Sequence, residues 1–467
     1  MTFLPAWPPE HPALVLEQGR RVSYGELRSE VEALRGAFRG PGVVACLCRN
    51  DLPSLCVYLA GLDAGVVPLL LPSHLQPAQL DSILGAYRPR YLFGDAAGPG
   101  SEGTVRWEGM GRALVERPDG SPGELHPDLA LLLPTSGSTG SPKLVRLSRR
   151  NLEANADAIR SYLALGPGER AITSLPMHYS YGLSVINSHL KAGASLVMTD
   201  RSVMDAAFWK LMREESVTSL AGVPYTYEML LRLRIERLDM PAVRTLTQAG
   251  GRLAADKARQ VAQACAGRGI RFFTMYGQTE ATARIAYLPP ERAVEKAGSI
   301  GVAIPGGRLW LEAEDGSVIE APEEAGQLVY EGPNVSLGYA CSQEDLSLGD
   351  ERHGVLRTGD LAVRDAEGFY RIVGRLNRFV KLYGVRVSLD DVERLLSEFG
   401  YTAAATGEDD ALRLFVAGEA AVDAEALRTR LAEVLGVNRA GLGVQGLPAL
   451  PRLSTGKIDY GSLPKAP

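Results

Sequence analysis

Short apolar runs alternate with amphipathic segments through most of the first 300 residues, and this alternation limits the chain to few folds. Runs typical of buried strands include residues 43–48 and 271–275, and helical spacing of apolar residues recurs at 24–38 and 255–266. Strands that alternate with helices of this length form βαβ units and largely parallel sheets. The pattern predicts an α/β protein with doubly wound sheets.

The pattern changes after residue 300, where short strands are separated by Gly and Asp turns, as expected for a small β-barrel-like unit. A last section follows Gly374-Arg375, with helices expected at 389–398 and 424–435 among short strands. We therefore expect an N-terminal domain over 1–376 and a small α+β C-terminal domain over 377–467, joined by a hinge.

The composition is that of an ordinary globular protein and excludes several classes of partner. A formal charge of -5 gives no basic face for nucleic acid. The five cysteines lack zinc-site spacing, which favours a reducing cytoplasm. The N-terminus lacks the features of a signal peptide. The longest apolar stretch, 55–72, contains Asp63 and is expected to form a buried helix and strand rather than a membrane span.

A loop rich in glycine and hydroxyls, ending in Lys143, follows the apolar run 129–133. Such loops hold polyphosphates, because glycines let backbone N–H groups approach phosphate oxygens while hydroxyls and lysine add hydrogen bonds and charge. Taken alone, the loop is equally typical of a Gly/Ser turn. The interval from Gly137 to Lys143 does not fit the Walker A spacing. A different nucleotide chemistry is therefore indicated.

Four more motifs follow this loop in a fixed order: Tyr276-Gly277-Gln278-Thr279-Glu280, Tyr339 with Arg357-Thr358-Gly359-Asp360, Gly374-Arg375 followed by Gly384, and Leu453-Ser454-Thr455-Gly456-Lys457-Ile458. Together they resemble the adenylate-forming (AMP-binding) superfamily, which includes acyl-CoA and aryl-CoA synthetases, stand-alone carrier-protein ligases and luciferases. The resemblance covers nearly the whole chain.

The resemblance implies attack of a carboxylate on the α-phosphate of ATP, which gives an acyl-adenylate and pyrophosphate. Cations, a metal and fixed N–H donors stabilise such a transition state. The loop would hold the β,γ-phosphates, with Lys143 as an accessory contact. Glu280 would bind Mg²⁺, Thr279 the α-phosphate, Asp360 the ribose, and Arg375 the ribose or a phosphate. The implied ATP-binding set also contains these residues: Thr135, Ser136, Gly137, Ser138, Thr139, Gly140, Gly250, Gly251, Tyr276 and Gly277.

Lys457 would be the catalytic cation, because the resemblance places it between the carboxylate and the α-phosphate. A solvated lysine is the alternative for any lysine considered alone. The hinge would lie at Asn377, where the family commonly has Asp or Lys. Gly384 would line a narrow tunnel for the thiol, with an ordinary turn glycine as the alternative.

The acid pocket implied by the resemblance contains Tyr179, Tyr181, Gly182, Tyr225 and Met275. Tyr179 replaces the family's usual histidine, and His178 stands one position earlier, so either side chain could gate the pocket. Gly182 falls where amino-acid activators place an aspartate, which disfavours an α-amino acid substrate. The set contains no evident cation and suits a neutral acyl or aryl tail.

The sequence thus predicts ATP-dependent activation of a small carboxylic acid, followed by transfer to a thiol. We expect coenzyme A or a separate acyl-carrier protein as the acceptor, with ATP and Mg²⁺ as cofactors. Two enzymatic alternatives are an amide-forming ligase and a stand-alone amino-acid-activating enzyme. A nucleotide-binding scaffold that has lost turnover is the non-enzymatic alternative, and the joint presence of Glu280, Asp360 and Lys457 disfavours it.

Overall fold

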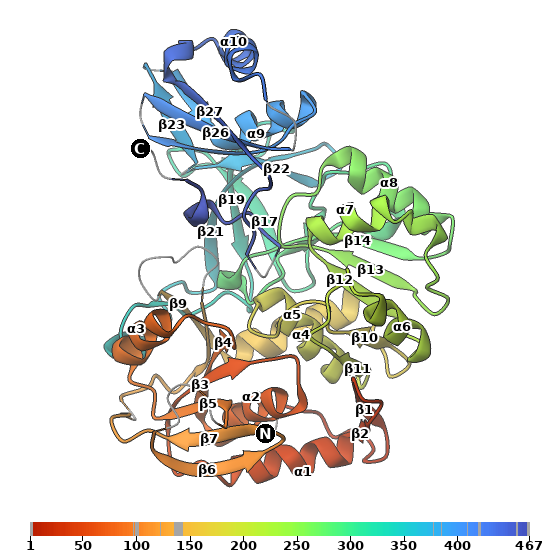
Figure 1. Cartoon of the computed structure of the whole chain (residues 1–467), viewed down its shortest axis with the longest axis vertical. Coiled ribbons are helices and arrows are strands. Elements are labelled where there is room, and N and C mark those ends of the chain that lie inside the picture. Colours follow the sequence, from red (N-terminus) through yellow and green to blue (C-terminus); the bar gives the residue numbers. More distant parts are fainter. Residues whose placement is uncertain are drawn as a thin grey trace. The chain divides into compact units, whose positions relative to one another are not determined.

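The computed structural model (Figure 1) divides the chain into two compact units. Unit 1 comprises Met1–Leu309 and Tyr330–Leu356, and unit 2 comprises Trp310–Val329 and Arg357–Pro467. The structure describes residues 3–96, 98, 102–121, 123–134, 143–376, 378–383, 385–408, 410–418, 422–453 and 456–464. The boundary expected at residue 376 stays a prediction.

Unit 1 contains a nine-stranded sheet whose centre is parallel, as the alternating pattern predicted. The strands from β14 to β1 pair in parallel, and the outer strands pair antiparallel. In spatial order the strands are β16 (Val302–Ala303), β15 (Ala286–Tyr287), β14 (Arg271–Tyr276), β13 (Thr245–Gln248), β12 (Ser219–Gly222), β10 (Arg170–Ile172), β11 (Ser195–Met198), β1 (Pro12–Leu16) and β2 (Arg21–Ser23).

A second, eight-stranded sheet in unit 1 has a parallel centre and antiparallel edges. In spatial order its strands are β20 (Gly338–Ala340), β9 (Leu144–Ser148), β8 (Leu129–Pro134), β4 (Val66–Pro72), β3 (Gly42–Cys48), β5 (Tyr91–Asp95), β7 (Arg112–Glu116) and β6 (Thr104–Gly109). Strands β8 and β9 flank the glycine-rich loop and pair antiparallel, with Pro134 opposite Leu144.

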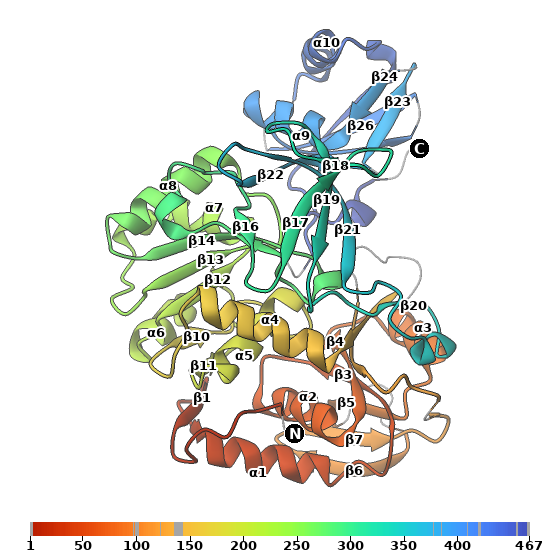
Figure 2. The same ribbon diagram turned by 180° about the vertical axis from the view of Figure 1, so that it is seen from behind.

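Helices cover both faces of these sheets (Figures 1 and 2). Helix α4 packs on β8 and β9, α5 packs on β10 and β11, and the two helices contact each other, so they form the layer between the sheets. The helices of unit 1 are α1 (Tyr24–Arg35), α2 (Leu52–Ala64), α3 (Pro77–Tyr87), α4 (Arg149–Tyr162), α5 (Ser180–Lys191), α6 (Ala206–Glu214), α7 (Pro224–Arg232) and α8 (Ala255–Ala266).

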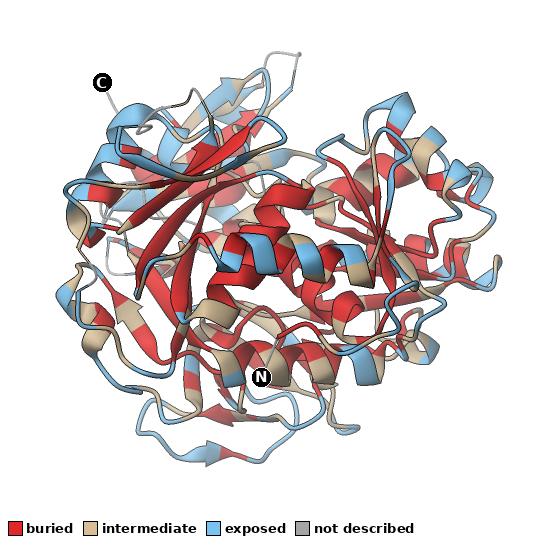
Figure 3. Cartoon of the chain, turned by 90° about the horizontal axis from the view of Figure 1, so that it is seen from below, coloured by how far each residue is buried: buried red, intermediate tan, exposed pale blue. Residues whose placement is uncertain are grey.

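Strand β3 shows why both faces need helices. Its residues are all buried, because alternate side chains point to opposite faces and each face is covered. Val44 and Cys46 join the core cluster that contains α2, whereas Val43 and Ala45 join the cluster that contains α3. Cys46 and Cys48 stand at alternate positions of this strand. Figure 3 shows buried residues along the strands and along one side of helices.

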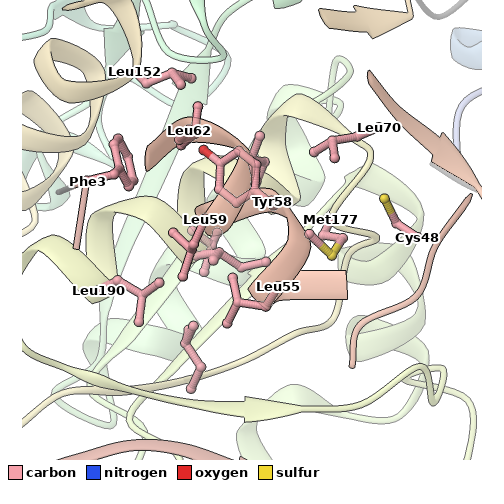
Figure 4. Close-up of a cluster of buried hydrophobic side chains, with 14 of the residues drawn as sticks. Phe3, Cys48, Leu55, Tyr58, Leu59, Leu62, Leu70, Leu152, Met177 and Leu190 are labelled. Atoms are coloured by element: carbon pink, nitrogen blue, oxygen red, sulfur yellow. The ribbon is translucent and has the colours of Figure 1, made fainter. Parts of the chain in front are cut away.

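Helix α2 lies deep in this core and explains the longest apolar stretch of the sequence. Asp51 caps its start by accepting a hydrogen bond from the Ser54 backbone N–H at 2.8 Å, and Gly65 ends it with a φ of 69°. Figure 4 shows Leu55, Tyr58 and Leu59 of α2 among apolar side chains of neighbouring elements. The rest of the stretch forms strand β4, and no helix within the described residues is long and apolar enough to cross a membrane.

The β-rich section forms an open five-stranded sheet, in the order β18 (Val318–Ile319), β17 (Arg308–Glu312), β19 (Gly326–Glu331), β21 (Val355–Arg364) and β22 (Tyr370–Arg375). The C-terminal section is α+β, as predicted. Its elements are β23 (Phe379–Leu382), β24 (Val385–Ser388), α9 (Leu389–Glu398), β25 (Thr402–Glu408), β26 (Ala411–Ala417), α10 (Ala424–Leu435) and β27 (Leu442–Leu447).

Candidate active site

The glycine-rich loop from Thr135 to Gly140 lies outside the described residues, but Lys143 at its end is described. The Lys143 Nζ lies 3.5 Å from the ring centroid of Tyr339 on β20, which is a cation–π contact. Two motifs that are far apart in the sequence, the loop and the Tyr339 motif, therefore meet at the edge where β9 pairs with β20.

The Tyr276–Glu280 motif begins at the end of β14 and folds back on itself. A Cβ atom at Gly277 would overlap the Ala283 carbonyl, so only glycine fits where the chain crosses itself. The crossing is closed by hydrogen bonds from Ile285 N to Tyr276 O (2.9 Å) and from Ala283 N to Gln278 O (3.1 Å). Within the loop, Thr279–Ala281 form one short 3-10 turn, called η2. The motif is thus a rigid loop with Thr279 and Glu280 at its tip.

Thr279 and Glu280 are held by hydrogen bonds to three other segments of unit 1. The Glu280 Oε1 accepts a hydrogen bond from the Tyr339 hydroxyl at 2.7 Å, and the Glu280 carbonyl accepts one from Ser336 N at 2.9 Å. The Thr279 and Ser180 hydroxyls lie 3.1 Å apart. No partner is recorded for Glu280 Oε2 among the described residues, so this oxygen is open to a ligand.

Tyr339 keeps its proton, and this fixes the orientation of the Glu280 carboxylate. Burial raises the pKa of Tyr339 to about 12, and the nearby Glu280 charge adds to the rise. The phenol therefore donates to the carboxylate at neutral pH. Arg352 also lies over the Tyr339 ring, with its Cζ 4.8 Å from the centroid. One carboxylate and two cations thus surround this tyrosine, an arrangement that suits a metal-bound polyphosphate.

Gly250 and Gly251 follow strand β13, at the carboxyl edge of the parallel sheet where α/β proteins usually bind ligands. Gly250 has a φ of 84°, and a Cβ there would overlap the Tyr179 hydroxyl. Tyr179, rather than His178, therefore lies against Gly250. The pKa of His178 is lowered to about 4, mainly by burial and to a smaller extent by the charge of nearby His74.

The predicted acid-pocket residues lie around the start of α5 and the ends of β13 and β14. Tyr181 is buried, donates to the Thr247 carbonyl at 2.8 Å, and packs edge-on against Tyr179 with centroids 6.2 Å apart. Met275 is buried on β14, and Tyr225 is half-buried on α7. A Cβ at Gly182 would overlap the Pro176 carbonyl, so this glycine serves close packing and does not direct a side chain into a pocket.

The sequence indicated no cation in this region, but the structure contains one. Arg284 is 1% exposed and stands four residues after Glu280. Its Cζ lies 4.4 Å from the Tyr181 ring centroid, and its guanidinium donates to the Tyr162 hydroxyl at 3.0 Å and contacts the Met275 sulfur. The one sign of this cation in the sequence was an arginine within residues 281–286, whose other side chains are weakly polar or apolar.

In unit 2, the structure brings Asp360 and Arg375 together, as their shared ATP-binding prediction requires. They face each other across β21 and β22, and the Arg375 Nε donates to Asp360 Oδ1 at 2.8 Å. Gly359 has a φ of 74°, which favours glycine and turns the strand so that Asp360 is buried. Arg357, the first residue of the same motif, donates two hydrogen bonds to the Glu312 carboxylate, at 2.8 and 3.1 Å.

Lys457 lies on the returning arm of a tight hairpin, opposite Leu453. Leu453 N donates to Lys457 O at 2.9 Å, Gly456 has a φ of 77°, and Arg452 pairs with Ile458. The hairpin is anchored just beyond this pairing, where the Tyr460 hydroxyl donates to Glu393 at 2.9 Å. Ser454 and Thr455 of the motif, the hinge candidate Asn377 and the tunnel candidate Gly384 all lie outside the described residues.

Residues 5–340 match the family model for AMP-binding enzymes. The chain belongs to that family. It is 29% identical over 406 residues to a feruloyl-CoA synthase from Amycolatopsis sp (84% of this chain, 80% of the relative). It is 30% identical over 412 residues to an indoleacetate–CoA ligase from Aromatoleum aromaticum (81% and 78%). A shorter match, 30% over 276 residues, is to an L-proline–[L-prolyl-carrier protein] ligase from Pseudomonas fluorescens (58% and 53%).

The fold agrees with this assignment. The o-succinylbenzoate CoA synthetase of Bacillus subtilis, solved with its acyl-adenylate intermediate, superposes with a TM-score of 0.78 at 24% identity over 98% of this chain and 96% of that one. The same Bacillus protein was also solved with ATP and a magnesium ion. The predicted family and fold class are confirmed. The chain is an AMP-forming acid–thiol ligase, which uses ATP to activate a carboxylic acid and then forms a thioester.

Proposed function

We propose that the predicted site residues carry out the adenylation step in this chain. The observation that supports it best is the Glu280 carboxylate, which Tyr339 holds beside Thr279 while Lys143 lies on the same tyrosine ring. In this proposal Lys143 and the loop from Thr135 to Gly140 hold the β,γ-phosphates. Thr279 donates to the α-phosphate, where charge develops in the transition state.

The donor set at Glu280 fits Mg²⁺, because this hard cation prefers carboxylate oxygens and Oε2 has no recorded partner among the described residues. When bound, the ion would neutralise phosphate charge. Tyr339 does not compete for this oxygen, because it donates to Oε1. Tyr276, Gly277, Gly250 and Gly251 contribute the backbone edge that faces the nucleotide.

In unit 2, Asp360 is the proposed acceptor for the ribose hydroxyls, and Arg375 fixes its orientation and balances its charge. Lys457 is the proposed catalytic cation, which neutralises both anions as the carboxylate attacks the α-phosphate. Lys457 stands next to the turn of its hairpin, directly after Gly456. Asn377 remains the proposed hinge that lets the small domain exchange Lys457 for the thiol tunnel at Gly384.

The proposed substrate is a small carboxylic acid without an α-amino group, held among Tyr179, Tyr181, Gly182, Tyr225 and Met275. Tyr179 is the proposed gate, because its hydroxyl lies against Gly250. The thiol acceptor is coenzyme A or a free carrier protein, since relatives named for both acceptors match this chain. A cytoplasmic setting stays a proposal, and the five free cysteines, four of them buried, support it.

Replacement of Lys457 by alanine tests this assignment. We expect Lys457→Ala to abolish ATP–pyrophosphate exchange with every acid that the native enzyme uses, while thioester formation from a supplied acyl-adenylate is retained. Lys210→Ala, which removes an exposed lysine of unit 1, is the matched control and should leave both half-reactions unchanged. Exchange that survives Lys457→Ala would refute the role of this lysine.

A further inference from the structure

Arg284 is an unusual buried cation, because no carboxylate lies within ion-pair distance of it among the described residues. Its recorded partners are the Tyr162 hydroxyl (3.0 Å), the Ser184 hydroxyl (3.2 Å), the Met275 sulfur and the Tyr181 ring. These are neutral groups and weak acceptors. The second terminal nitrogen, Nη2, has no recorded partner. A guanidinium has five N–H donors, so Arg284 retains donor capacity for a further acceptor.

Buried charges in proteins are normally paired, because removal from water is costly. Arg146, on strand β9, shows the usual solution in the same unit. It is fully buried, and its guanidinium donates to the Glu351 carboxylate at 2.6 Å and to the Tyr339 carbonyl at 2.9 Å. Arg284 has an equal charge and nearly equal burial but lacks such an anion. The difference indicates that the anion for Arg284 is supplied from outside the chain.

A small cavity lies beside Arg284. Its lining is largely apolar, with Leu163, Leu165, Val185, Leu220 and Ala221, and also contains Ser188, His189, Ser219, Thr245 and Thr247. Thr247 also accepts a hydrogen bond from the hydroxyl of Tyr181, which is a predicted acid-pocket residue. The cavity therefore adjoins the predicted acid pocket. His189 is neutral at pH 7, because burial lowers its pKa to about 4 despite the contact of its Nδ1 with the Val185 carbonyl at 2.8 Å. Arg284 is therefore the cation in this lining.

The arginine is also held rigidly. Its backbone carbonyl accepts hydrogen bonds from Asn155 at 3.0 Å and Asn334 at 2.9 Å. The preceding residues, Thr282 and Ala283, have φ values of 59° and 116°, which non-glycine residues rarely adopt. Local strain of this kind persists where surrounding contacts enforce it, and it is common at ligand sites. The guanidinium is thus preorganised for a ligand.

We propose that Arg284 binds a second anionic group, a carboxylate or sulfonate, at the far end of the acid substrate. This inference rests on the proposed function, in which Tyr181 and Met275 line the acid pocket. The reacting carboxylate then faces the nucleotide, and the distal oxyanion pairs with Arg284 and the cavity hydroxyls. The substrate class is an acid with an anionic tail, in place of the neutral tail that the sequence suggested. A planar guanidinium suits such an oxyanion, because it donates two parallel hydrogen bonds.

The test is ATP–pyrophosphate exchange with pairs of acids that differ only in the tail: succinate against butyrate, adipate against hexanoate, and terephthalate against para-toluate. The native enzyme should prefer the acid with the anionic tail in at least one pair. Arg284→Met should lower that preference in kcat/KM by about 100-fold, mainly through KM, because it removes one partner of a buried charge pair. Arg284→Lys should retain part of the preference.

Arg146→Met is the matched control, since it also removes a buried guanidinium but should leave the preference unchanged. The preference is a ratio measured on one enzyme sample, so partial unfolding of a variant does not change it. A native preference for neutral tails, or a preference that survives Arg284→Met, would overturn the inference and leave the proposed function standing. Failure of every acid to support exchange by the native enzyme would overturn both.

Discussion

Arg146 and Arg284 are two arginines of unit 1 that are nearly equally buried but differently partnered. Arg146 is surrounded by carbonyls and one carboxylate, and it ties β9 to the segment that contains β20. Arg284 contacts hydroxyls, a thioether and a ring, and it faces a cavity. The partners of Arg146 are backbone carbonyls and a carboxylate, which stabilise the fold. The partners of Arg284 leave N–H donors of its guanidinium available. The partners of a buried charge, more than its burial, therefore distinguish a structural residue from a candidate binding residue.

The largest expected effect is on stability and separates the two arginines directly. Arg146→Met should lower the free energy of unfolding by about 3 kcal/mol, because it leaves buried carbonyls without donors. Arg284→Met should change it by less than about 1 kcal/mol, since a buried charge without an anion contributes little net stability. Urea unfolding of both variants measures the difference. Equal losses would mean that Arg284 is a structural residue like Arg146.

The free energy of unfolding is also expected to depend on pH through His189, which lines the same cavity as Arg284. The expected size is similar to the loss in Arg146→Met. The His189 pKa is lowered to about 4, mainly by burial and to a smaller extent by the Arg284 charge. Because the folded-state pKa lies below that of the unfolded chain, the unfolded state binds a proton first as pH falls. The contribution of neutral, buried His189 to the free energy of unfolding is fully present above pH ~6.5. About 3 kcal/mol of that free energy is lost as the pH falls towards ~4.

Thermal unfolding between these pH values measures that loss in the native enzyme and in His189→Gln, which should show a flatter profile. His178, whose pKa is also lowered to about 4, leaves some slope in the variant. Substitution of the exposed His353 by asparagine is the control and should leave the profile unchanged. An unchanged profile in His189→Gln would show that the histidine is not buried as a neutral group.

The smallest effect is expected at Glu351, the carboxylate partner of Arg146, whose side chain is 52% exposed. Glu351→Gln should cost at most about 1 kcal/mol, because a partly exposed ion pair is screened by water and the amide oxygen still accepts a hydrogen bond. Calorimetry with and without 1 M NaCl, roughly a 3 Å Debye length, checks this screening. A loss as large as that of Arg146→Met would show that the carboxylate, and not the carbonyls, holds the arginine.

The sequence predicted the regular part of the fold well. The helices expected at 255–266, 389–398 and 424–435 have those bounds in the structure, because helical spacing of apolar residues is a local signal. The β6–β7 hairpin was not predicted, since β6 is largely exposed and lacks a clear apolar alternation.

The site was predictable only where motifs carry it. The family resemblance indicated Glu280 and the Tyr339 motif, yet only the folded chain shows that the tyrosine hydroxyl holds the carboxylate. Arg284 could not be inferred as a pocket cation, because a single arginine has no pattern and its surroundings come from three elements, α4, α5 and β14. By sequence, the lack of an aspartate at Gly182 disfavours an α-amino acid substrate. In the structure the glycine has a packing reason as well, because a Cβ atom there would overlap the Pro176 carbonyl.

The self-crossing of the loop at Gly277 and Ala283 has a consequence for engineering this enzyme. The loop carries Glu280 at its tip and Arg284 at its base, so one short peptide joins the proposed nucleotide end of the site to the proposed acid end. Mutational libraries aimed at new acids should therefore spare residues 277–283 and vary the opposite wall on α5, β12 and β13. Homologous recombination between relatives would likewise succeed best when this loop is inherited as one block.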